Sequence, residues 1–99
     1  MRILNDRIYR WARDRGIFSK GTIEGQAIKT LEEVKELIDA IDAKDEAAMK
    51  DAIGDIYVTI FIQAVMNRWS IDECVKHAVE QIEGRTGKME DGVFVKDAH

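Results

Sequence analysis

The sequence contains no proline and only one cysteine, Cys74, among 99 residues. Without proline, the residue that most often interrupts a helix is missing. A single cysteine excludes a disulfide within the chain and favours a reducing compartment. Asn5, Asp6 and Arg7 soon follow the first four residues, so we expect no signal peptide. We therefore predict a protein of the cytoplasm.

The chain also lacks an excess of positive charge and a long hydrophobic run. Its formal net charge is −4, whereas nonspecific binding to nucleic acid requires a basic face. The longest apolar run, Ile56 to Met66, is too short to span a bilayer and includes Gln63. Neither nucleic acid nor a membrane is an expected partner. An acidic chain can still bind a nucleotide when metal ions mediate the contact.

Four segments have the apolar periodicity of amphipathic helices, over residues 2–15, 23–42, 45–68 and 71–83. Thr22, Asp45 and Ser70 are the expected N-caps of the last three. Residues 17–21 are expected to form a loop. The tail, residues 84–99, is expected to contain a turn at Asp91-Gly92 and a short extended piece after it. The length suits one domain, residues 1–99, and we predict an all-α four-helix bundle.

The third predicted helix contains a conflict between propensity and pattern. Residues 56–62 are rich in β-branched and aromatic side chains, so a buried strand is the alternative. Apolar side chains at positions 49, 52, 53, 56, 60 and 64 keep a helical rhythm, and this favours the helix. A helix that is apolar on all sides is expected to be covered by other helices and partly by a second subunit. We therefore expect a homo-oligomer.

Two other predicted helices have apolar stripes that we expect to face the core. In the helix over 23–42, the stripe is Ala27, Leu31, Val34, Ile38 and Ile41. In the helix over 71–83, it is Ile71, Cys74, Val75, Ala78, Val79 and Ile82.

Acidic residues occur in pairs one helical turn apart on two neighbouring helices. Glu33 and Glu36 form one pair, and Asp51 and Asp55 form the other. If these helices pack antiparallel, the four carboxylates converge and need a cation among them. Asp55 borders the apolar run and therefore needs a partner. The partner is either Lys29, in a salt bridge, or a hard metal such as Mg²⁺ or Mn²⁺.

Other side chains are candidates for contacts to a nucleotide. No glycine-rich phosphate loop is present, so Lys29, Arg85 and Lys88 are the candidate phosphate ligands. The candidates to contact a nucleobase are Gln26 and the aromatic residues, among which Trp11 and Phe18 stand out. Most aromatic residues at helical spacing belong to a core, but Phe18 lies in the predicted loop.

Several blocks in this order resemble the MazG-type nucleoside triphosphate pyrophosphohydrolases, especially their small, phage-like, single-domain members. The blocks are Trp11-Ala12-x-x-Arg15-Gly16, Gln26-x-x-Lys29-x-x-Glu32-Glu33-x-x-Glu36-Leu37, Gly54-Asp55 and Arg85-x-Gly87-Lys88-Met89. The resemblance implies an all-α fold, a dimer or a dimer of dimers, and a location in the host cytoplasm if a phage encodes the chain. It also implies Mg²⁺-dependent cleavage of a (deoxy)nucleoside triphosphate to the monophosphate and pyrophosphate.

The family signature is Glu-x-x-Glu followed by Glu-x-x-Asp, and one of its four acids is missing. Glu33, Glu36 and Asp55 match, but Ala52 stands where the third acid is expected. Asp51 is one residue away, which rotates its side chain by about 100° around the helix. The number of bound metal ions is therefore open.

Two hypotheses follow. In the first, the chain is an enzyme. Glu33, Glu36 and Asp55 hold the metal, with Asp51 or Glu32 assisting, and Glu32 or Glu33 is the general base. Lys29, Arg85 and Lys88 stabilise the charge that develops on the pyrophosphate. In the second, the chain is a non-catalytic helical oligomer that senses nucleotides or binds a partner. Phosphoribosyl-ATP pyrophosphohydrolase activity is a further possibility within the same resemblance.

Overall fold

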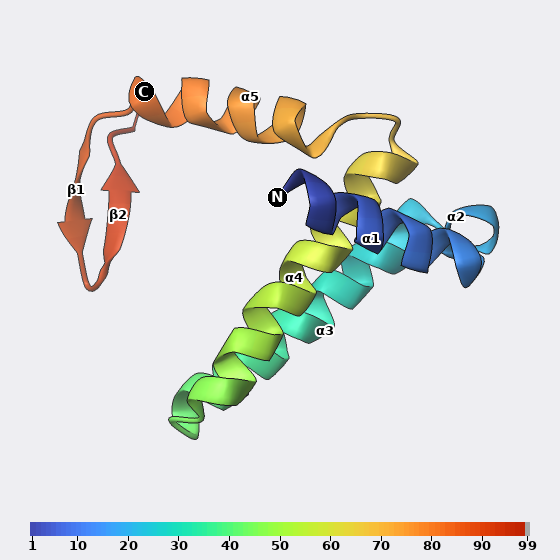
Figure 1. Ribbon diagram of the computed structural model, residues 1–99. Coiled ribbons are helices and arrows are strands. Elements are labelled where there is room, and N and C mark those ends of the chain that lie inside the picture. The colour runs from blue at the N-terminus through green and yellow to red at the C-terminus, as the bar shows by residue number, and fades with distance from the viewer. Residues whose placement is uncertain (99) are drawn as a thin grey trace. The chain divides into compact units, whose positions relative to one another are not determined.

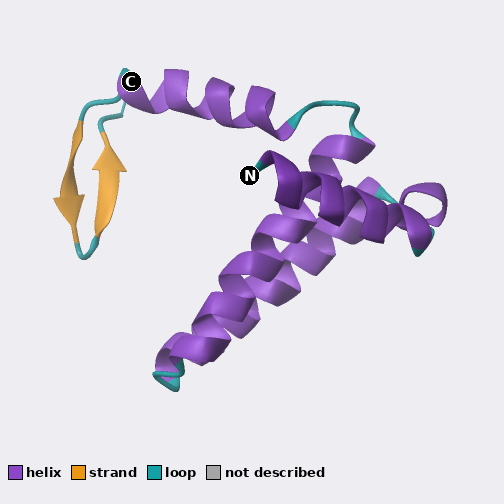
Figure 2. Ribbon diagram, in the orientation of Figure 1, coloured by secondary structure: helices purple, strands orange, loops and turns teal. Residues whose placement is uncertain are grey.

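The structure is a computed structural model that describes residues 1–98, so His99, the last residue of the predicted tail, lies outside it. The described chain forms two compact units, Met1–Trp69 and the residues from Ser70 onward. Figures 1 and 2 show their helices and strands. Each unit is described by itself below.

The first unit is built on two long antiparallel helices. α3 (Ile23–Asp42) and α4 (Glu46–Met66) lie side by side and are joined by a short turn (Figure 1). The Thr22 hydroxyl accepts a hydrogen bond from the Gly25 N–H at 2.9 Å, and Asp45 caps α4 in the same way. Such caps satisfy N–H groups that have no partner within the helix. Both predicted N-caps are confirmed.

α4 is helical through its whole length, although residues 56–62 favour strand by propensity. The prediction of helix over strand is confirmed, with the helix ending at Met66, two residues before the predicted end. Ala52, Phe61 and Ile62 are buried side chains on different sides of α4. Tertiary packing has thus overridden a weak local preference.

Residues before α3 form two helices where one helix and a loop were expected. α1 (Arg2–Asp14) ends one residue before the predicted end, and α2 (Ile17–Lys20) occupies the predicted loop. The unit therefore has an additional short helix, and the expected count of four was wrong. Gly16, between α1 and α2, has a φ of 76°, a left-handed conformation that glycine adopts without strain. This turn lets α2 fold back so that Phe18 stacks on Tyr9, with ring centroids 5.1 Å apart.

The face of α3 that packs inside the unit differs from the predicted one. The predicted stripe is largely on the outside: Leu31 is 68% exposed, Ile38 53% and Ile41 52%. The face turned towards α4 instead includes two polar residues, Thr30 and Glu33, together with Leu37 and Ala40. Apolar periodicity identified a face that needs cover, but this unit does not supply the cover.

The second unit contains α5 (Ile71–Glu83) and an antiparallel hairpin of β1 (Gly87–Glu90) and β2 (Val93–Lys96). The capping box predicted at Ser70 is present, with reciprocal bonds between Ser70 and Glu73. Asp91 and Gly92 form the turn with φ of 49° and 85°, as Asp-Gly predicts. The expected short extended piece is thus one strand of a hairpin.

The apolar side chains of α5 are mostly exposed, contrary to the expectation that they face a core. Val75 is 53% exposed and Ile82 53%, whereas Ile71 at the start of the helix is buried. Most of the described chain is helical, so the all-α class holds. Within residues 1–98, no helix has both the length and the apolar character needed to cross a bilayer.

Candidate functional site

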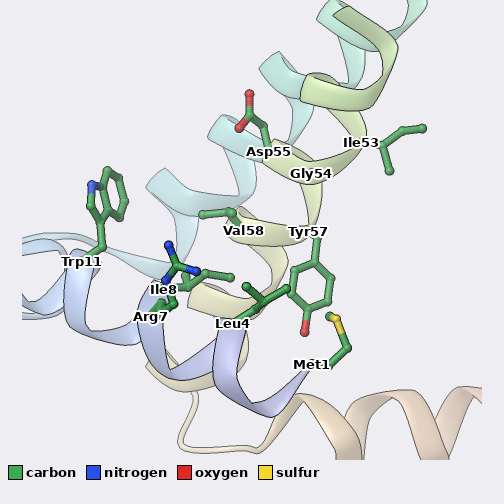
Figure 3. A pocket seen from close by; sticks show the side chains of 10 residues that line it. All are labelled: Met1, Leu4, Arg7, Ile8, Trp11, Ile53, Gly54, Asp55, Tyr57 and Val58. Carbon is green, nitrogen blue, oxygen red and sulfur yellow. The ribbon is translucent and has the colours of Figure 1, made fainter. Parts of the chain in front are cut away.

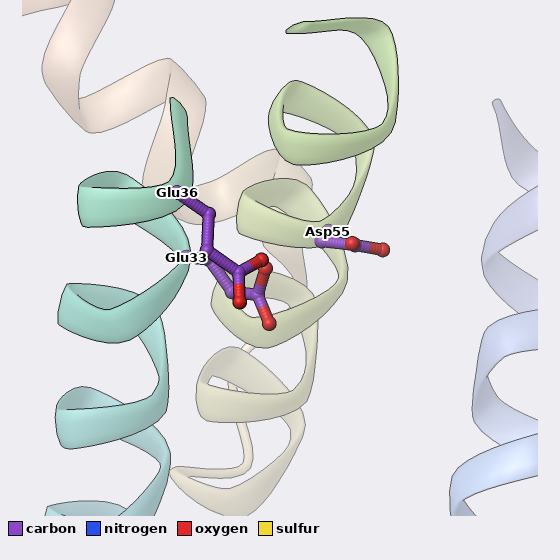
Figure 4. A group of neighbouring side chains, drawn as sticks. All are labelled: Glu33, Glu36 and Asp55. Carbon is purple, nitrogen blue, oxygen red and sulfur yellow. The ribbon is translucent and has the colours of Figure 1, made fainter. Parts of the chain in front are cut away.

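Three carboxylates from two helices come together on the first unit. Glu33 and Glu36 project from α3 and Asp55 projects from α4 (Figure 4). One oxygen from each residue lies within 4.8 Å of the others. Residues three apart on a helix share a face, and the antiparallel partner brings the third acid alongside. Two oxygens on opposite sides of a Mg²⁺ ion lie about 4.2 Å apart, so a small side-chain adjustment fits this group to such an ion.

Glu33 is the most informative of the three, because its two carboxylate oxygens have different surroundings. Its side chain is only 9% exposed, and Oε1 lies 3.5 Å from the Lys29 ammonium. Oε2 is buried and has no hydrogen-bond partner within the described chain. A buried carboxylate oxygen without a partner is costly. The donor set and this orphaned oxygen therefore fit a cation bound beside Oε2.

Lys29 pairs with residues of its own helix. Its ammonium lies 3.4 Å from Glu32 Oε2 and 3.5 Å from Glu33 Oε1. The hydrogen bond and charge of Glu32, and then the charge of Glu33, raise the pKa of Lys29 above its usual value, so the ammonium stays protonated at neutral pH. Among residues 1–98, Lys29 forms no salt bridge with Asp55. Of the two partners expected for Asp55, a lysine or a metal ion, the structure therefore does not provide the lysine.

Asp55 is held in surroundings that disfavour its charge. Desolvation raises its pKa above the ordinary value first, followed by repulsion from Glu33 and Asp51, and the positive charge of Lys29 offsets only part of this. A cation among the carboxylates would reverse the effect. Asp51 thus lies near enough to act on Asp55, although the group of three carboxylates does not include it.

An apolar groove of about 840 Å³ lies between α1 and α4 and reaches this group at Asp55 (Figure 3). Leu4, Ile8 and Trp11 line it from α1, and Tyr57 is among the residues that line it from α4. The Tyr57 hydroxyl donates a hydrogen bond of 2.7 Å to Asn5 Oδ1, which ties the two helices together. The groove can receive a flat apolar group with its polar end at Asp55.

The aromatic side chains predicted to contact a base have different surroundings. Trp11 lines the groove and is 45% exposed, with the Arg15 guanidinium 4.8 Å from its ring centre. Phe18 was singled out because it was expected in a loop. It lies in α2 and is half-buried against Tyr9, and its contact with a base stays a prediction.

A second cavity, of about 510 Å³, lies between the start of α3 and α4. Gln26, Lys29, Glu33 and Asp55 line it, and so does Lys20, which the sequence reasoning missed. No sequence signal marked Lys20, because its position depends on the short helix α2 that was expected to be a loop.

A polar network between α3 and α4 adjoins this cavity and was also missed. The Gln63 amide donates to Thr30 Oγ1 at 2.7 Å, and the hydroxyls of Thr30 and Thr59 lie 2.7 Å apart. Thr59 is 5% exposed and lines the cavity. The network places polar groups where a helix pair normally has apolar packing, and it holds the two helices in register beside the carboxylates.

The remaining predicted residues lie in the second unit. Arg85 follows α5, and Lys88 is in β1, where its ammonium lies 3.3 Å from Glu90. Their contact with phosphate stays a prediction. Ala52, at the position of the missing family acid, is 3% exposed on the inner face of α4.

Comparisons with known proteins agree with the resemblance of the sequence blocks. A model of the MazG nucleotide pyrophosphohydrolase domain matches residues 22–89. A protein of Haemophilus phage HP1 (strain HP1c1), described as an uncharacterized 18.2 kDa protein in the rep-hol intergenic region, is 37% identical over 60 residues. The aligned region covers 61% of this chain and 37% of the phage protein. No solved structure matches the chain. Because the domain match covers well over half of its residues, the chain belongs to the MazG nucleotide pyrophosphohydrolase family.

Proposed function

We propose that this chain hydrolyses a (deoxy)nucleoside triphosphate to the monophosphate and pyrophosphate, with Mg²⁺ as cofactor and Mn²⁺ as a substitute. The observation that carries this proposal is the group of three carboxylates on α3 and α4, in a chain of the MazG family. The matched phage protein also supports a location in the host cytoplasm.

Glu33, Glu36 and Asp55 would hold the cation, and Asp51 would assist from the preceding turn of α4. When bound, the cation neutralises charge on the phosphates and lowers the pKa of a coordinated water. The orphaned Oε2 of Glu33 supports this assignment, because the opposite oxygen of the same carboxylate already faces Lys29.

The chain's own residues supply the proton acceptor and a fixed positive charge. The oxygen of a water molecule attacks the α-phosphorus, the bond from the α-phosphorus to the bridging oxygen breaks, and its electron pair leaves with pyrophosphate. Glu32 accepts the proton of the water, since its carboxylate is exposed and lies outside the group of three. Glu33 is the second candidate for this role. Lys29 stabilises the charge that develops on the leaving oxygens.

The groove between α1 and α4 would receive the nucleoside. Trp11 offers an exposed ring for stacking, and the groove ends at Asp55, where the phosphates would begin. Gln26 lines the neighbouring cavity and would contact the phosphates or the sugar instead of a base edge.

The proposal is tested by measuring pyrophosphate and monophosphate release from a panel of canonical and modified (deoxy)nucleoside triphosphates with Mg²⁺. The wild-type chain should release both products in equal amounts from at least one substrate, and a chelator should stop the reaction. Asp39 is an exposed acid on α3 outside the group, so Asp39→Asn is the matched control and should retain activity. Absence of turnover on every substrate contradicts the proposal.

A non-catalytic sensor or interaction module is the second candidate, and Ala52 favours it. The buried methyl of Ala52 replaces the acid that completes the family signature. Calorimetric titration with Mg²⁺ and a non-hydrolysable triphosphate separates the candidates. Tight binding without any product from the natural triphosphate indicates a sensor, whereas an interaction module shows no metal-dependent binding.

Self-association is part of the proposal, as a dimer or tetramer of identical chains. The outer face of α3, defined by Ile28, Leu31, Ile38 and Ile41, is more than half exposed at each residue. A second copy of the chain would remove this apolar surface from water. The family match spans both compact units, which supports the further proposal that residues 1–99 form a single domain.

A further inference from the structure

The cavity at the start of α3 differs in chemistry from the groove between α1 and α4. Lys20 and Lys29 both line the cavity, whereas the lining of the groove is mainly apolar. Trp11, Asp55 and Val58 line both spaces, so the two meet beside the carboxylates. A molecule with one flat end and one polyanionic end matches this arrangement.

We propose that the cavity at the start of α3 binds the pyrophosphate portion of the substrate, with Lys20 and the backbone N–H of Thr22 as its ligands. This inference rests on the proposed function and adds to it the direction in which the substrate lies. The β- and γ-phosphates point towards Lys20, and the nucleoside points along the groove on the other side of Asp55.

Lys20 is the first ground for this assignment. Within residues 1–98 its ammonium forms no ion pair, whereas Lys29 is already shared between Glu32 and Glu33. Its side chain runs back along Gly16, with Cδ 3.7 Å from the position that a Cβ on Gly16 would take. The stem is therefore guided by the turn between α1 and α2. Glu33 and Asp55 line the same cavity, but within residues 1–98 neither carboxylate forms an ion pair with Lys20.

The start of α3 is the second ground. The first N–H groups of a helix have no partner within the helix, and the positive end of its dipole favours anions. The Thr22 hydroxyl takes one of these N–H groups, from Gly25. Thr22 itself lines the cavity, and its own N–H forms no hydrogen bond within residues 1–98. Gly21 and Gly25 also line the cavity, but their N–H groups are already bonded to Ile17 O and Thr22 Oγ1.

Glu33 supplies an observation independent of the helix terminus. Its unpartnered Oε2 is buried, and the residue lines the same cavity as Lys20 and Lys29. A carboxylate would repel a phosphate placed directly against it, so a cation is required between them. The lining of one cavity thus includes a candidate cation ligand and two lysines, the residue types that a metal-bound pyrophosphate needs.

The test is calorimetric titration of pyrophosphate, in the presence of Mg²⁺, into the full chain and three variants. Lys20→Gln removes the charge, and Lys20→Arg retains it. Lys44→Gln removes a charge from the turn at the opposite end of the α3–α4 pair and is the matched control (Figure 1). We expect the Kd for pyrophosphate to rise about 10-fold in Lys20→Gln, the loss of one charge-assisted hydrogen bond. It should rise less than about 3-fold in Lys20→Arg and not change in Lys44→Gln.

A parallel titration with the nucleoside monophosphate tests the direction. Lys20→Gln should leave its Kd unchanged, because the monophosphate occupies the groove and the metal site only. Unchanged pyrophosphate binding in Lys20→Gln overturns the inference, and so does an equal loss for both products. No pyrophosphate binding by the wild-type chain has the same consequence.

These outcomes are separable from the fate of the proposed function. If the chain binds pyrophosphate through Lys20 but cleaves no triphosphate, the subsite stands and the enzymatic proposal fails. If the chain cleaves a triphosphate and Lys20→Gln binds pyrophosphate as the wild type does, the enzymatic proposal stands and the subsite fails.

Discussion

The two faces of α3 reverse the usual distribution of polar and apolar residues. The face turned towards α4 includes Thr30 and the buried Glu33, whereas the outer face exposes Leu31 and Ile38. Burying polar groups costs free energy unless they find partners, and exposing apolar surface forgoes a stabilising contribution.

The two faces of α3 serve different roles under our proposal. The inner face is polar because it holds the carboxylates and the network that positions them. The outer face is apolar because, under our proposal, it is covered by a second copy of the chain. A substitution on the inner face should therefore affect activity without changing self-association, and a substitution on the outer face should affect self-association without removing the carboxylates.

The largest expected effect comes from the carboxylates at the edge of the inner face. Glu36→Gln and Asp55→Asn should each lower turnover by at least about 100-fold, because each variant removes an expected ligand of the metal. Circular dichroism should show unchanged helix content, and Asp39→Asn should remain active. Normal pyrophosphate release from both variants would rule out the proposed metal site.

On the outer face, the double substitution Leu31→Glu and Ile38→Glu should convert the assembly to a monomer. Each apolar side chain contributes about 1.5–3 kcal/mol when fully buried, and a buried charge adds a penalty. Light scattering coupled to size exclusion measures the mass. Asp39→Lys changes charge on the same helix and should leave the mass unaltered. A wild-type chain that is itself monomeric would contradict the proposal for this face.

The buried network gives a smaller effect. Thr59→Val should lower the free energy of unfolding by about 1–2 kcal/mol, because the hydroxyl of Thr30 loses a buried partner. The double variant Thr30→Val and Thr59→Val should cost less than the sum of the single changes. Urea unfolding of the four proteins measures this coupling. Strict additivity would show that the two hydroxyls do not act together.

The smallest effect concerns the charge of Asp55 in the metal-free chain. Desolvation and neighbouring carboxylates raise its pKa above 3.8, so its ionised form is less favourable in the folded than in the unfolded chain. Without metal, Asp55→Asn should therefore be more stable at pH 7, by less than about 1 kcal/mol because the residue is exposed.

The pH dependence follows from the sign of this shift. The advantage of Asp55→Asn should shrink as the pH falls through the raised pKa and vanish below 3.8, where Asp55 is protonated in both states. Adding Mg²⁺ should raise the Tm of the wild-type chain and leave that of the variant unchanged. Thermal unfolding across this pH range, with and without Mg²⁺, measures both effects.

Local signals in the sequence predicted the helices well. Thr22, Asp45 and Ser70 marked the starts of α3, α4 and α5, because capping depends on residues only a few positions apart. The meeting of Glu33, Glu36 and Asp55 was also foreseeable, since it needs only helical spacing and an antiparallel neighbour.

Features that depend on folding back or on a second chain were not predictable in this way. The periodicity of Leu31 and Ile38 marks an apolar face but carries no information on whether the cover comes from the same chain. Likewise, Lys20 reaches the cavity only because α2 folds back after Gly16. Thr30 and Gln63 are far apart in sequence, and no pattern pairs them.

Gly54 lies in the interior of α4 and forms part of the wall of the groove beside Asp55. A Cβ at this position would meet no atom within 4 Å, so the surrounding packing does not require glycine. Glycine within a helix is about 0.5–1 kcal/mol less favourable than alanine. The helix is thus less stable here than it would be with alanine, and the missing methyl group leaves space in the groove that, under the proposed function, receives the nucleoside. Gly54 therefore lowers the stability of α4 and leaves space in the groove beside Asp55.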